Sequence, residues 1–348
     1  MNKIPIAVLG ATGVVGQRFV QLLADHPIFE ITALTASERK VGQRYSDACR
    51  WVLSPQPPPS AAGIILQSSE PNLNARVIFS ALPASTATEL EPQFAQAGYA
   101  VCSNSSAFRS AEDVPMIIPE VNADHLALIS HQQNERGWSG FIVTSPNCTT
   151  TGIVMPLKPL HEAFGLRQVF AVSMQAVSGA GYPGVPSLDI IDNVLTLIPG
   201  EEEKVERETR ELLGQIADGR NIAADFIVSA QTNRVPVLDG HTICLSVGFE
   251  DKPTIENAIA VLSRFRGPSS VRILPSAPDH PIIVRPEPDR PQPRWDRDSE
   301  NGMAVSVGRV RTCPLLDLRL VTTVHNTLRG AASGSILNAE LLAAEKYL

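Results

Sequence analysis

Short apolar runs alternate with stretches of helical spacing through the first half of the chain. Consecutive apolar residues predict strands, and apolar residues that recur every three or four positions predict helices. On this basis we expect strands at 4–9, 29–34, 77–81, 99–102 and 141–144, and helices at 14–23 and 89–96. The Pro-rich stretch 54–59 is expected to form a loop. Because strands alternate with helices, the pattern predicts an α/β fold with a parallel, doubly wound sheet.

The second half of the chain has a different pattern. We expect long strands at 169–177 and 243–249, helices at 188–197 and 201–213, final strands at 303–309 and 316–323, and a C-terminal helix at 326–344. Residues 277–298 are rich in Pro, Arg and Asp, which predicts a long irregular segment. Such a segment inside a compact domain is often functional or part of an interface.

Composition narrows the class of protein. The chain has 348 residues, of which 43% are hydrophobic and 19% charged, and its length favours two domains. Its formal charge is −7 and it has no basic block, which argues against nucleic acid or an anionic membrane as a partner. We find no apolar run long enough to span a membrane and no signal peptide.

Cysteine usage indicates a reducing compartment. The five cysteines, at positions 49, 102, 148, 244 and 313, are scattered and form no CxxC pair or Cys/His cluster. We therefore expect free thiols, no metal site and a cytoplasmic location. In that setting a single well-placed cysteine is a candidate catalytic group.

A glycine-rich turn follows the first predicted strand and begins the first predicted helix. It reads Gly10-Ala11-Thr12-Gly13-Val14-Val15-Gly16. Glycines at this position let the backbone approach a pyrophosphate, which the helix N-terminus stabilises. The spacing is GxxGxxG rather than GxGxxG, and glycines at such turns also serve packing alone. We expect dinucleotide contacts from Gly10, Thr12, Gly13, Val14 and Val15.

The end of the second predicted strand indicates which nicotinamide cofactor binds. An acidic residue there would bind the ribose 2′-hydroxyl of NAD. Here Ser37 and Arg39 can bind a 2′-phosphate instead, which predicts NADP. Glu38, between them, would repel a phosphate if it pointed inward, and the alternative interpretation is a solvated charged turn.

Cys148 is the candidate nucleophile. It lies in Ser145-Pro146-Asn147-Cys148, between a predicted strand and a helical stretch, where a helix N-terminus would favour the thiolate. Asn147 and nearby backbone N–H groups are candidates to hold an oxyanion. The alternative interpretation is a buried small hydrophobe. A nucleophilic cysteine beside a nicotinamide implies hemithioacetal and thioester intermediates, with a histidine as acid/base.

The chain resembles a known family along nearly its whole length. The matching motifs are GATGVVG (10–16), SNSSAFR (103–109), SPNCTTT (145–151), QAVSGAGY (175–182), GEEEK (200–204), RVPVLDGH (234–241), DRPQPR (289–294) and HNTLR (325–329). They resemble the aspartate-β-semialdehyde dehydrogenases of the branch found in archaea, fungi and some bacteria. The resemblance implies NADPH-dependent reduction of L-aspartyl-4-phosphate to the semialdehyde with release of phosphate. That step belongs to lysine, methionine and threonine biosynthesis.

The resemblance also implies roles for individual residues. At the reacting carbon, Cys148 would be the nucleophile, His241 the acid/base and Gln175 the group that orients the acyl carbon. Around the substrate, Arg234 would pair with the α-carboxylate, Glu201 would contact the amine, and Arg109 and Lys204 would bind the phosphate. Ser178, Gly179 and Asn326 would lie next to the cofactor. Guanidinium–carboxylate pairing suits Arg234. Residues at i and i+3 share a helix face, so Glu201 and Lys204 can reach one ligand. Which of the three glutamates at 201–203 binds stays open, because acidic residues also suit a first helical turn.

The resemblance further implies the domain organisation. A Rossmann-like NADP-binding domain would span 1–147 and be completed by a C-terminal helix at 327–348. An α+β catalytic and dimerisation domain with a mixed sheet would span 148–326. We expect a homodimer or homotetramer, with 277–298 as a candidate interface.

Other activities share this scaffold. N-acetyl-γ-glutamyl-phosphate reductases typically have Pro-Gly-Cys-Tyr around the nucleophile, whereas this chain has Pro146-Asn147-Cys148-Thr149. Malonyl-CoA reductase is poorly separated by motifs and stays an alternative. Glyceraldehyde-3-phosphate dehydrogenase shares the chemistry but has different residues around its cysteine. A cofactor-binding regulator without turnover would not need Cys148, His241, Arg234 and Arg109 together.

Overall fold

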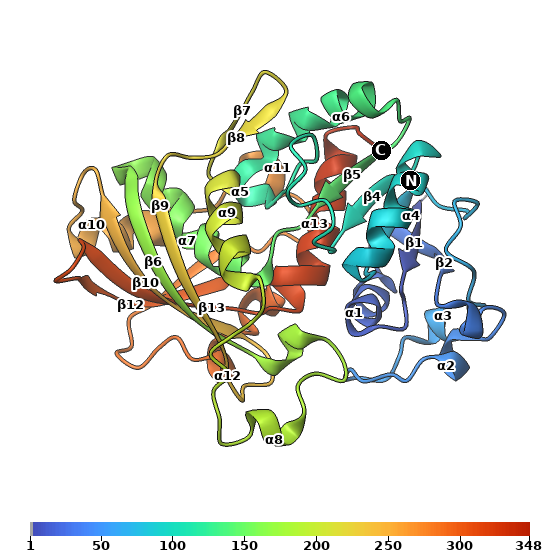
Figure 1. Ribbon diagram of the computed structural model, residues 1–348, viewed down its shortest axis with the longest axis horizontal. Coiled ribbons are helices and arrows are strands. Elements are labelled where there is room, and N and C mark those ends of the chain that lie inside the picture. The colour runs from blue at the N-terminus through green and yellow to red at the C-terminus, as the bar shows by residue number, and fades with distance from the viewer. Residues whose placement is uncertain (1–2) are drawn as a thin grey trace.

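The computed structural model describes residues 3–348 and contains two large sheets side by side (Figure 1). The first sheet is parallel, in the order β2-β1-β3-β4-β5. Its strands are β1 (Ile4–Leu9), β2 (Phe29–Leu34), β3 (Val77–Ser80), β4 (Ala100–Ser103) and β5 (Phe141–Thr144). The last three are buried along their whole length, as expected of strands covered on both faces. This confirms the predicted doubly wound α/β architecture.

Helices from both ends of the chain cover the first sheet. The long ones are α1 (Val14–Leu23), α4 (Ala84–Gln96), α6 (Leu128–Arg136) and α13 (Ser333–Ala344), and the short ones are α2 (Tyr45–Ala48), α3 (Pro59–Ala62) and α5 (Pro119–Asn122). Helix α13 packs against β4 and α1. Its residues Ile336, Leu337 and Leu341 share a core with Ile6 and Val8 of β1. The chain therefore returns to its N-terminal sheet after building the second one.

The second sheet is mixed, in the order β11-β12-β13-β10-β6-β9. Its strands are β6 (Leu166–Gln175), β9 (Ile227–Arg234), β10 (His241–Phe249), β11 (Ile282–Arg285), β12 (Val305–Thr312) and β13 (Leu318–Val324). Strand β10 is antiparallel to β6 and β13, whereas β6 is parallel to β9. Helices α7 (Cys148–Phe164), α9 (Glu201–Leu212) and α10 (Ile255–Arg264) pack on one face. On the other face Phe170, Cys244 and Arg319 are exposed.

Smaller elements lie at the edges of this half. They are α8 (Ser187–Ile190), the hairpin β7 (Gln215–Ala217) and β8 (Arg220–Ile222), α11 (Ser269–Arg272) and α12 (Pro293–Asp296). The segment 277–298, expected to be wholly irregular, contains β11 and α12 within its loops. The strand expected at 169–177 begins at Leu166 and ends at Gln175, and the expected C-terminal helix begins as a π-helical turn, Leu328–Ala332, before α13.

The helix expected at 188–197 is wrong beyond residue 190. Leu188, Ile191, Val194 and Leu197 have helical spacing, but they are between 50% and 89% exposed. With no core to bury an apolar face, little favours a helix there, since most helical stability comes from packing. The backbone instead turns at Asp192, where φ is +59°.

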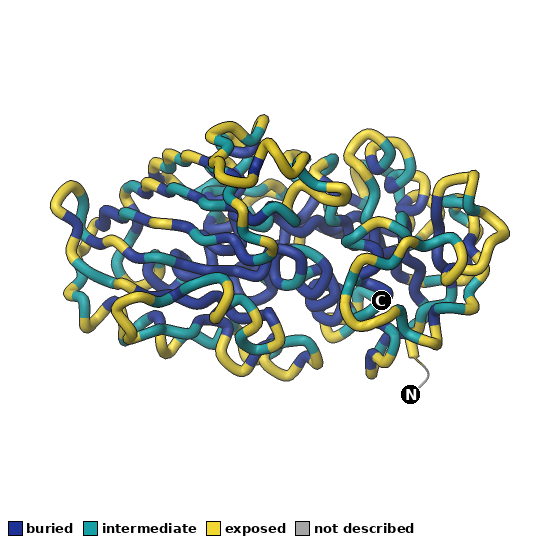
Figure 2. The backbone as a smooth tube through the Cα atoms, turned by 90° about the horizontal axis from the view of Figure 1, so that it is seen from below, coloured by how far each residue is buried: buried dark blue, intermediate teal, exposed yellow. Residues whose placement is uncertain are grey.

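Buried chain runs through the interior of both halves, with exposed loops around it (Figure 2). Helix α7 follows β5 of the first sheet and packs on β10 and β13 of the second, so its first residue lies where the two sheets meet. Within 3–348 no helix has the length and apolar character needed to cross a membrane. The same residues contain no group of three or more His, Cys, Asp or Glu side chains arranged to hold a metal ion.

Candidate active site

Cys148 is the first residue of α7, and Asn147 caps that helix. The Asn147 side-chain oxygen accepts hydrogen bonds from the backbone N–H groups of Thr149 (2.8 Å) and Thr150 (3.3 Å). Asparagine is among the preferred N-cap residues because its oxygen satisfies N–H groups that have no partner in the helix. The motif Ser-Pro-Asn-Cys thus ends one element, begins the next and places the thiol at the start of the helix.

His241 lies beside the thiol. Its Nε2 is 3.1 Å from the Cys148 sulfur, and its Nδ1 accepts a hydrogen bond from the Ala176 N–H at 3.0 Å. A neutral imidazole carries one N–H, so this backbone bond assigns the proton to Nε2, which faces the sulfur. Burial, and then the positive charge of Arg234, lower the pKa of His241 to about 3. The ring is therefore neutral across the physiological range.

The protonation state of the thiol differs from the expectation. The helix N-terminus predicts a thiolate, and the Thr149 N–H, Arg109 and Arg234 do lower the pKa of Cys148. Burial, followed by the negative charge of Glu201, outweighs them and raises that pKa to about 12. Desolvation disfavours the charged form more than one helix end favours it. In the free protein Cys148 is therefore a neutral thiol.

Three strands of the second sheet bring Gln175, Arg234 and His241, the predicted acyl site, to the same end of the sheet. Gln175 ends β6, Arg234 ends β9 and pairs with Gln175 in the ladder, and His241 begins β10 on the other side of β6. Arg234 donates to the Ala176 carbonyl at 2.9 Å, and Gln175 donates to the Glu201 carboxylate at 3.1 Å. Arg234 and His241 therefore converge through the sheet order, although seven residues separate them in the sequence.

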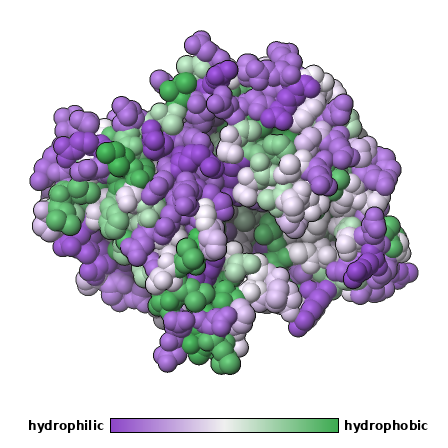
Figure 3. Space-filling view, in the orientation of Figure 1, coloured by the Kyte–Doolittle hydropathy of each residue, from purple (hydrophilic) through white to green (hydrophobic). Residues whose placement is uncertain are grey.

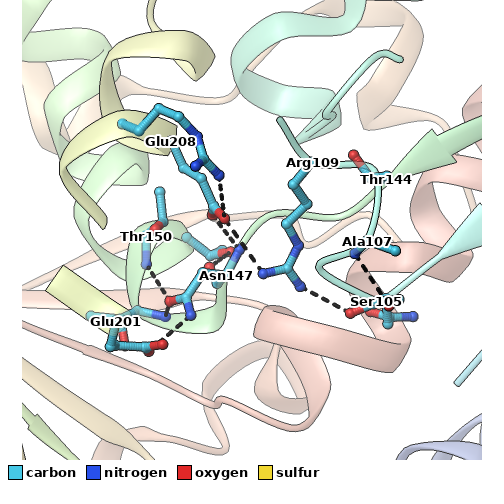
Figure 4. Close-up of polar contacts among 12 residues, drawn as sticks. Ser105, Ala107, Arg109, Thr144, Asn147, Thr150, Glu201 and Glu208 are labelled. Carbon is cyan, nitrogen blue, oxygen red and sulfur yellow. Dashed lines mark hydrogen bonds and ion pairs between the residues drawn. The ribbon is translucent and has the colours of Figure 1, made fainter. Parts of the chain in front are cut away.

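Glu201 connects the acyl site to the nucleophile loop. It begins α9, and its Oε1 also accepts from the side-chain N–H of Asn147 at 2.8 Å. Figure 4 shows Glu201 and Asn147 side by side beneath Thr150. Lys204 lies one turn further along α9, half-buried, and within 3–348 its ammonium is in no ion pair. It therefore remains available to a ligand.

Arg109 approaches the same loop from the first sheet. Its Nη2 donates to the Asn104 carbonyl at 2.9 Å, and its Nη1 lies 3.5 Å from Oε1 of Glu208 (Figure 4). Its Nε is buried and has no hydrogen-bond partner among residues 3–348. A buried donor without a partner is costly, so the guanidinium is poised to bind an oxyanion.

Sequence reasoning missed three contributors to this site. Glu208 is fully buried against Arg109 and Asn147, and its spacing of seven from Glu201 was a usable signal that both share one helix face. The Ala176 N–H fixes which ring nitrogen of His241 carries the proton. This is a backbone contact, so the identity of the side chain at position 176 gives no sign of it. A Cβ on Gly330 would lie 2.5 Å from the Cβ of Cys148, so only glycine fits there.

The glycine-rich turn has the backbone that a dinucleotide requires. Gly10 has φ of +72° and a Cβ there would lie 3.0 Å from the Ala81 carbonyl oxygen, so both conformation and space call for glycine. Gly13 precedes α1 and is exposed, and no side chain in the described part of the chain caps the helix. The N-terminus of α1 is therefore open to an anionic group, which fits a pyrophosphate.

The other residues expected to contact the cofactor occupy two places. Ser37 and Arg39 are exposed after β2, and the neighbouring Lys40 donates to Thr12 of the glycine-rich turn at 3.2 Å. Asn326 donates to Ser178 at 2.8 Å and accepts from the Gly240 N–H at 2.9 Å. A Cβ on Gly179 would lie 2.7 Å from Nη1 of Arg234, so this glycine turn lies directly against the acyl site.

Comparison with known proteins identifies the family. Residues 5–129 match the model of the semialdehyde dehydrogenase NAD binding domain, and residues 157–329 match that of the semialdehyde dehydrogenase dimerisation domain. The chain is 52% identical to the aspartate-semialdehyde dehydrogenase of Archaeoglobus fulgidus, over 99% of both chains. It is 45% identical to that of Schizosaccharomyces pombe, over 97% of both.

A solved structure agrees. The aspartate semialdehyde dehydrogenase of Candida albicans, crystallised with NADP, is 41% identical and superposes with a TM-score of 0.92 over all of both chains. Both family models describe semialdehyde dehydrogenases, and the full-length relatives from an archaeon and two fungi are all described as aspartate-semialdehyde dehydrogenases. The chain therefore belongs to the aspartate-semialdehyde dehydrogenase family of enzymes.

Proposed function

We propose that this enzyme reduces L-aspartyl-4-phosphate to L-aspartate 4-semialdehyde with NADPH and releases phosphate. The observation that carries the proposal is the Cys148–His241 contact of 3.1 Å at an edge where Gln175 and Arg234 also end. The names of the relatives support the substrate, and the Candida albicans structure with NADP supports the cofactor. The step would serve lysine, methionine and threonine biosynthesis, including the diaminopimelate route.

Charge complementarity suggests how the substrate is held. The guanidinium of Arg234 would pair with the α-carboxylate, and Glu201 with the α-amine. Arg109, with its free Nε, and Lys204 would bind the phosphate. Contacts of this kind would bring the acyl carbon within reach of the Cys148 sulfur, which the addition step requires.

The chemistry at the acyl carbon would use groups already in place. The Cys148 sulfur adds to the carbonyl, the C–O bond to phosphate breaks, and a thioester remains. Bound NADPH would supply the hydride that reduces this thioester. The Gln175 amide and the N–H groups at the start of α7 would hold the oxyanion in both steps. The thiol must lose its proton as it attacks, and the departing phosphate can carry that proton away. His241 Nε2 already holds a proton that faces the sulfur, so this N–H would act as the acid that returns a proton to the sulfur when the C–S bond of the reduced intermediate breaks.

We propose that the cofactor binds at the N-terminus of α1. Gly10, Thr12, Gly13, Val14 and Val15 would cradle the pyrophosphate, and Ser37 and Arg39, joined by Lys40, would bind the 2′-phosphate. Ser178, Gly179 and Asn326 would lie beside the nicotinamide. The exposed Gly13 and the uncapped helix end support this assignment.

We propose further that two or four copies associate through the half that matches the dimerisation domain. Apolar residues gather on the α8 segment at the bottom of the view in Figure 3, where Leu188 is 89% exposed. Phe170 on the open sheet face and Ile227 on the edge strand β9 are also exposed. Exposed apolar patches commonly mark association surfaces. We also propose two domains: the first comprises residues 1–147 and 327–348, and the second comprises residues 148–326. The five free thiols support a cytoplasmic location, which we propose as well.

A spectrophotometric assay in the reverse direction tests the proposed function. L-aspartate semialdehyde, phosphate and NADP should produce NADPH absorbance, and the rate should depend on phosphate. Activity with malonyl-CoA and none with the semialdehyde would favour malonyl-CoA reductase instead. Activity only with N-acetylglutamate semialdehyde would favour the related acyl-phosphate reductase.

A further inference from the structure

Glu208 is a fully buried carboxylate that lies between the nucleophile loop and Arg109. It is 0% exposed and lies on α9, two turns after Glu201. Its Oε2 accepts a hydrogen bond of 2.6 Å from the Asn147 N–H, and its Oε1 lies 3.5 Å from Nη1 of Arg109 (Figure 4). Arg207 approaches the same oxygen at 3.9 Å from the exposed side. Burying a carboxylate costs desolvation energy, and the hydrogen bond from Asn147 and the charge of Arg109 offset that cost.

The contact with Asn147 acts on the nucleophile. A residue at an N-cap position has a backbone N–H with no acceptor inside the helix, and a buried N–H needs a partner. Glu208 supplies that partner, while Glu201 accepts from the Asn147 side chain at 2.8 Å. Two carboxylates of one helix therefore hold Asn147 from both sides. Because Cys148 is the next residue, the same contacts orient the sulfur.

The contact with Arg109 acts on the phosphate site. At 3.5 Å it is longer than an ordinary hydrogen bond, so it orients the guanidinium by charge without occupying it fully. The other anchor of Arg109 is the Asn104 carbonyl, at 2.9 Å from Nη2. Between these two anchors the buried Nε remains unpartnered and free for an oxyanion.

We propose that Glu208 is a positioning residue that joins the phosphate-binding Arg109 to the N-cap of the nucleophile helix. The inference rests on the phosphate-binding role proposed above for Arg109. The two contacts have different requirements. The Asn147 N–H needs an acceptor oxygen, whereas Arg109 needs a negative charge. Substitutions of Glu208 should therefore separate the two halves of the site.

Glu208→Gln tests this separation. The amide keeps an oxygen for the Asn147 N–H but turns an N–H₂ donor toward Arg109, so the guanidinium loses its anchor. In the phosphate-dependent assay the KM for phosphate should rise about tenfold, because the guanidinium loses the charge that orients it toward the phosphate. The kcat at saturating phosphate and the KM for the semialdehyde should stay within about twofold of the unchanged enzyme. Glu208→Asp, which keeps the charge, should recover part of the phosphate affinity.

Glu208→Leu removes the acceptor as well as the charge. Here kcat should also fall, by about tenfold or more, since the Asn147 N–H is left buried and unpaired. The rate of Cys148 alkylation by iodoacetamide should change in Glu208→Leu and stay unchanged in Glu208→Gln. Glu256→Gln is the matched control, because Glu256 is exposed at the start of α10 and its loss changes the net charge equally.

The results distinguish the two proposals. If Arg109→Leu raises the phosphate KM and Glu208→Gln does not, the inference about Glu208 is wrong. It is also wrong if Glu208→Gln changes the phosphate KM, the semialdehyde KM and kcat in equal proportion, as a general loosening of the fold would. An unchanged phosphate KM in both variants would refute the proposed role of Arg109 and the inference built on it.

Discussion

The cofactor loop and the acyl site are built in opposite ways. The candidate pyrophosphate site consists of one βα turn, Gly10 to Gly16, with Ser37 to Lys40 beside it. The proposed acyl site takes Arg109 from the loop after β4 of the first sheet, Cys148 from the helix between the sheets, Glu201 from α9, and Gln175, Arg234 and His241 from three strands of the second sheet.

This difference shows which part of an active site is local. The backbone conformation of a turn depends mainly on its own consecutive residues, so a glycine pattern predicts that conformation without knowledge of the tertiary structure. The ionisation of Cys148, in contrast, depends on burial and on charges from distant segments. The local helix-end effect favours the thiolate, and the assembled site overrides it. Three experiments sharpen this comparison.

Replacing the nucleophile should have the largest effect. Cys148→Ser should lower kcat by about a thousandfold or more, since a hydroxyl is far less nucleophilic than a thiol. The affinity for NADPH, measured by fluorescence titration, should be unchanged, because the conformation of the glycine loop does not depend on Cys148. Cys244→Ser, at an exposed cysteine, is the control and should retain full activity. A kcat close to that of the unchanged enzyme in Cys148→Ser would show that Cys148 is not the nucleophile.

The next largest expected effect is the change in the rate of Cys148 alkylation with pH. Because the pKa of Cys148 is raised to about 12, the thiol is protonated at neutral pH and its thiolate fraction grows up to that pKa. In the free enzyme the rate of inactivation by iodoacetamide should therefore rise about tenfold per pH unit from 7 to 10. If the inactivation rate is already constant near pH 7, the helix N-terminus and the arginines lower the pKa of Cys148 more than burial and Glu201 raise it, and the neutral thiol would be refuted.

The cofactor side should respond more weakly and separately. Arg39→Ala should raise the KM for NADP about tenfold by removing a charged partner of the 2′-phosphate, and should leave the KM for NAD unchanged. Arg272→Ala, at an exposed arginine of α11, serves as the control. Equal losses for NADP and NAD would show that Arg39 does not read the 2′-phosphate.

Much of the fold was predictable because its signals are local. The buried runs of β1 to β5 and the helical spacing of α1 gave the first sheet nearly to the residue. The helix expected at 188–197 failed because apolar spacing does not reveal whether a core exists to receive it. Strand β9 and helix α10 were not predicted. Arg234, which ends β9, could therefore be placed only by resemblance, without its neighbours.

The sequence by itself determined the glycine turn, the alternation of strands and helices, and the junction that places Cys148 near the start of a helix. These follow from conformational preferences of a few adjacent residues. Only the tertiary structure decided that the thiol is neutral, that the His241 proton faces the sulfur, and that Glu208 lies between Arg109 and Asn147. Desolvation and Coulomb interactions depend on distances between groups far apart in the chain, and folding sets those distances.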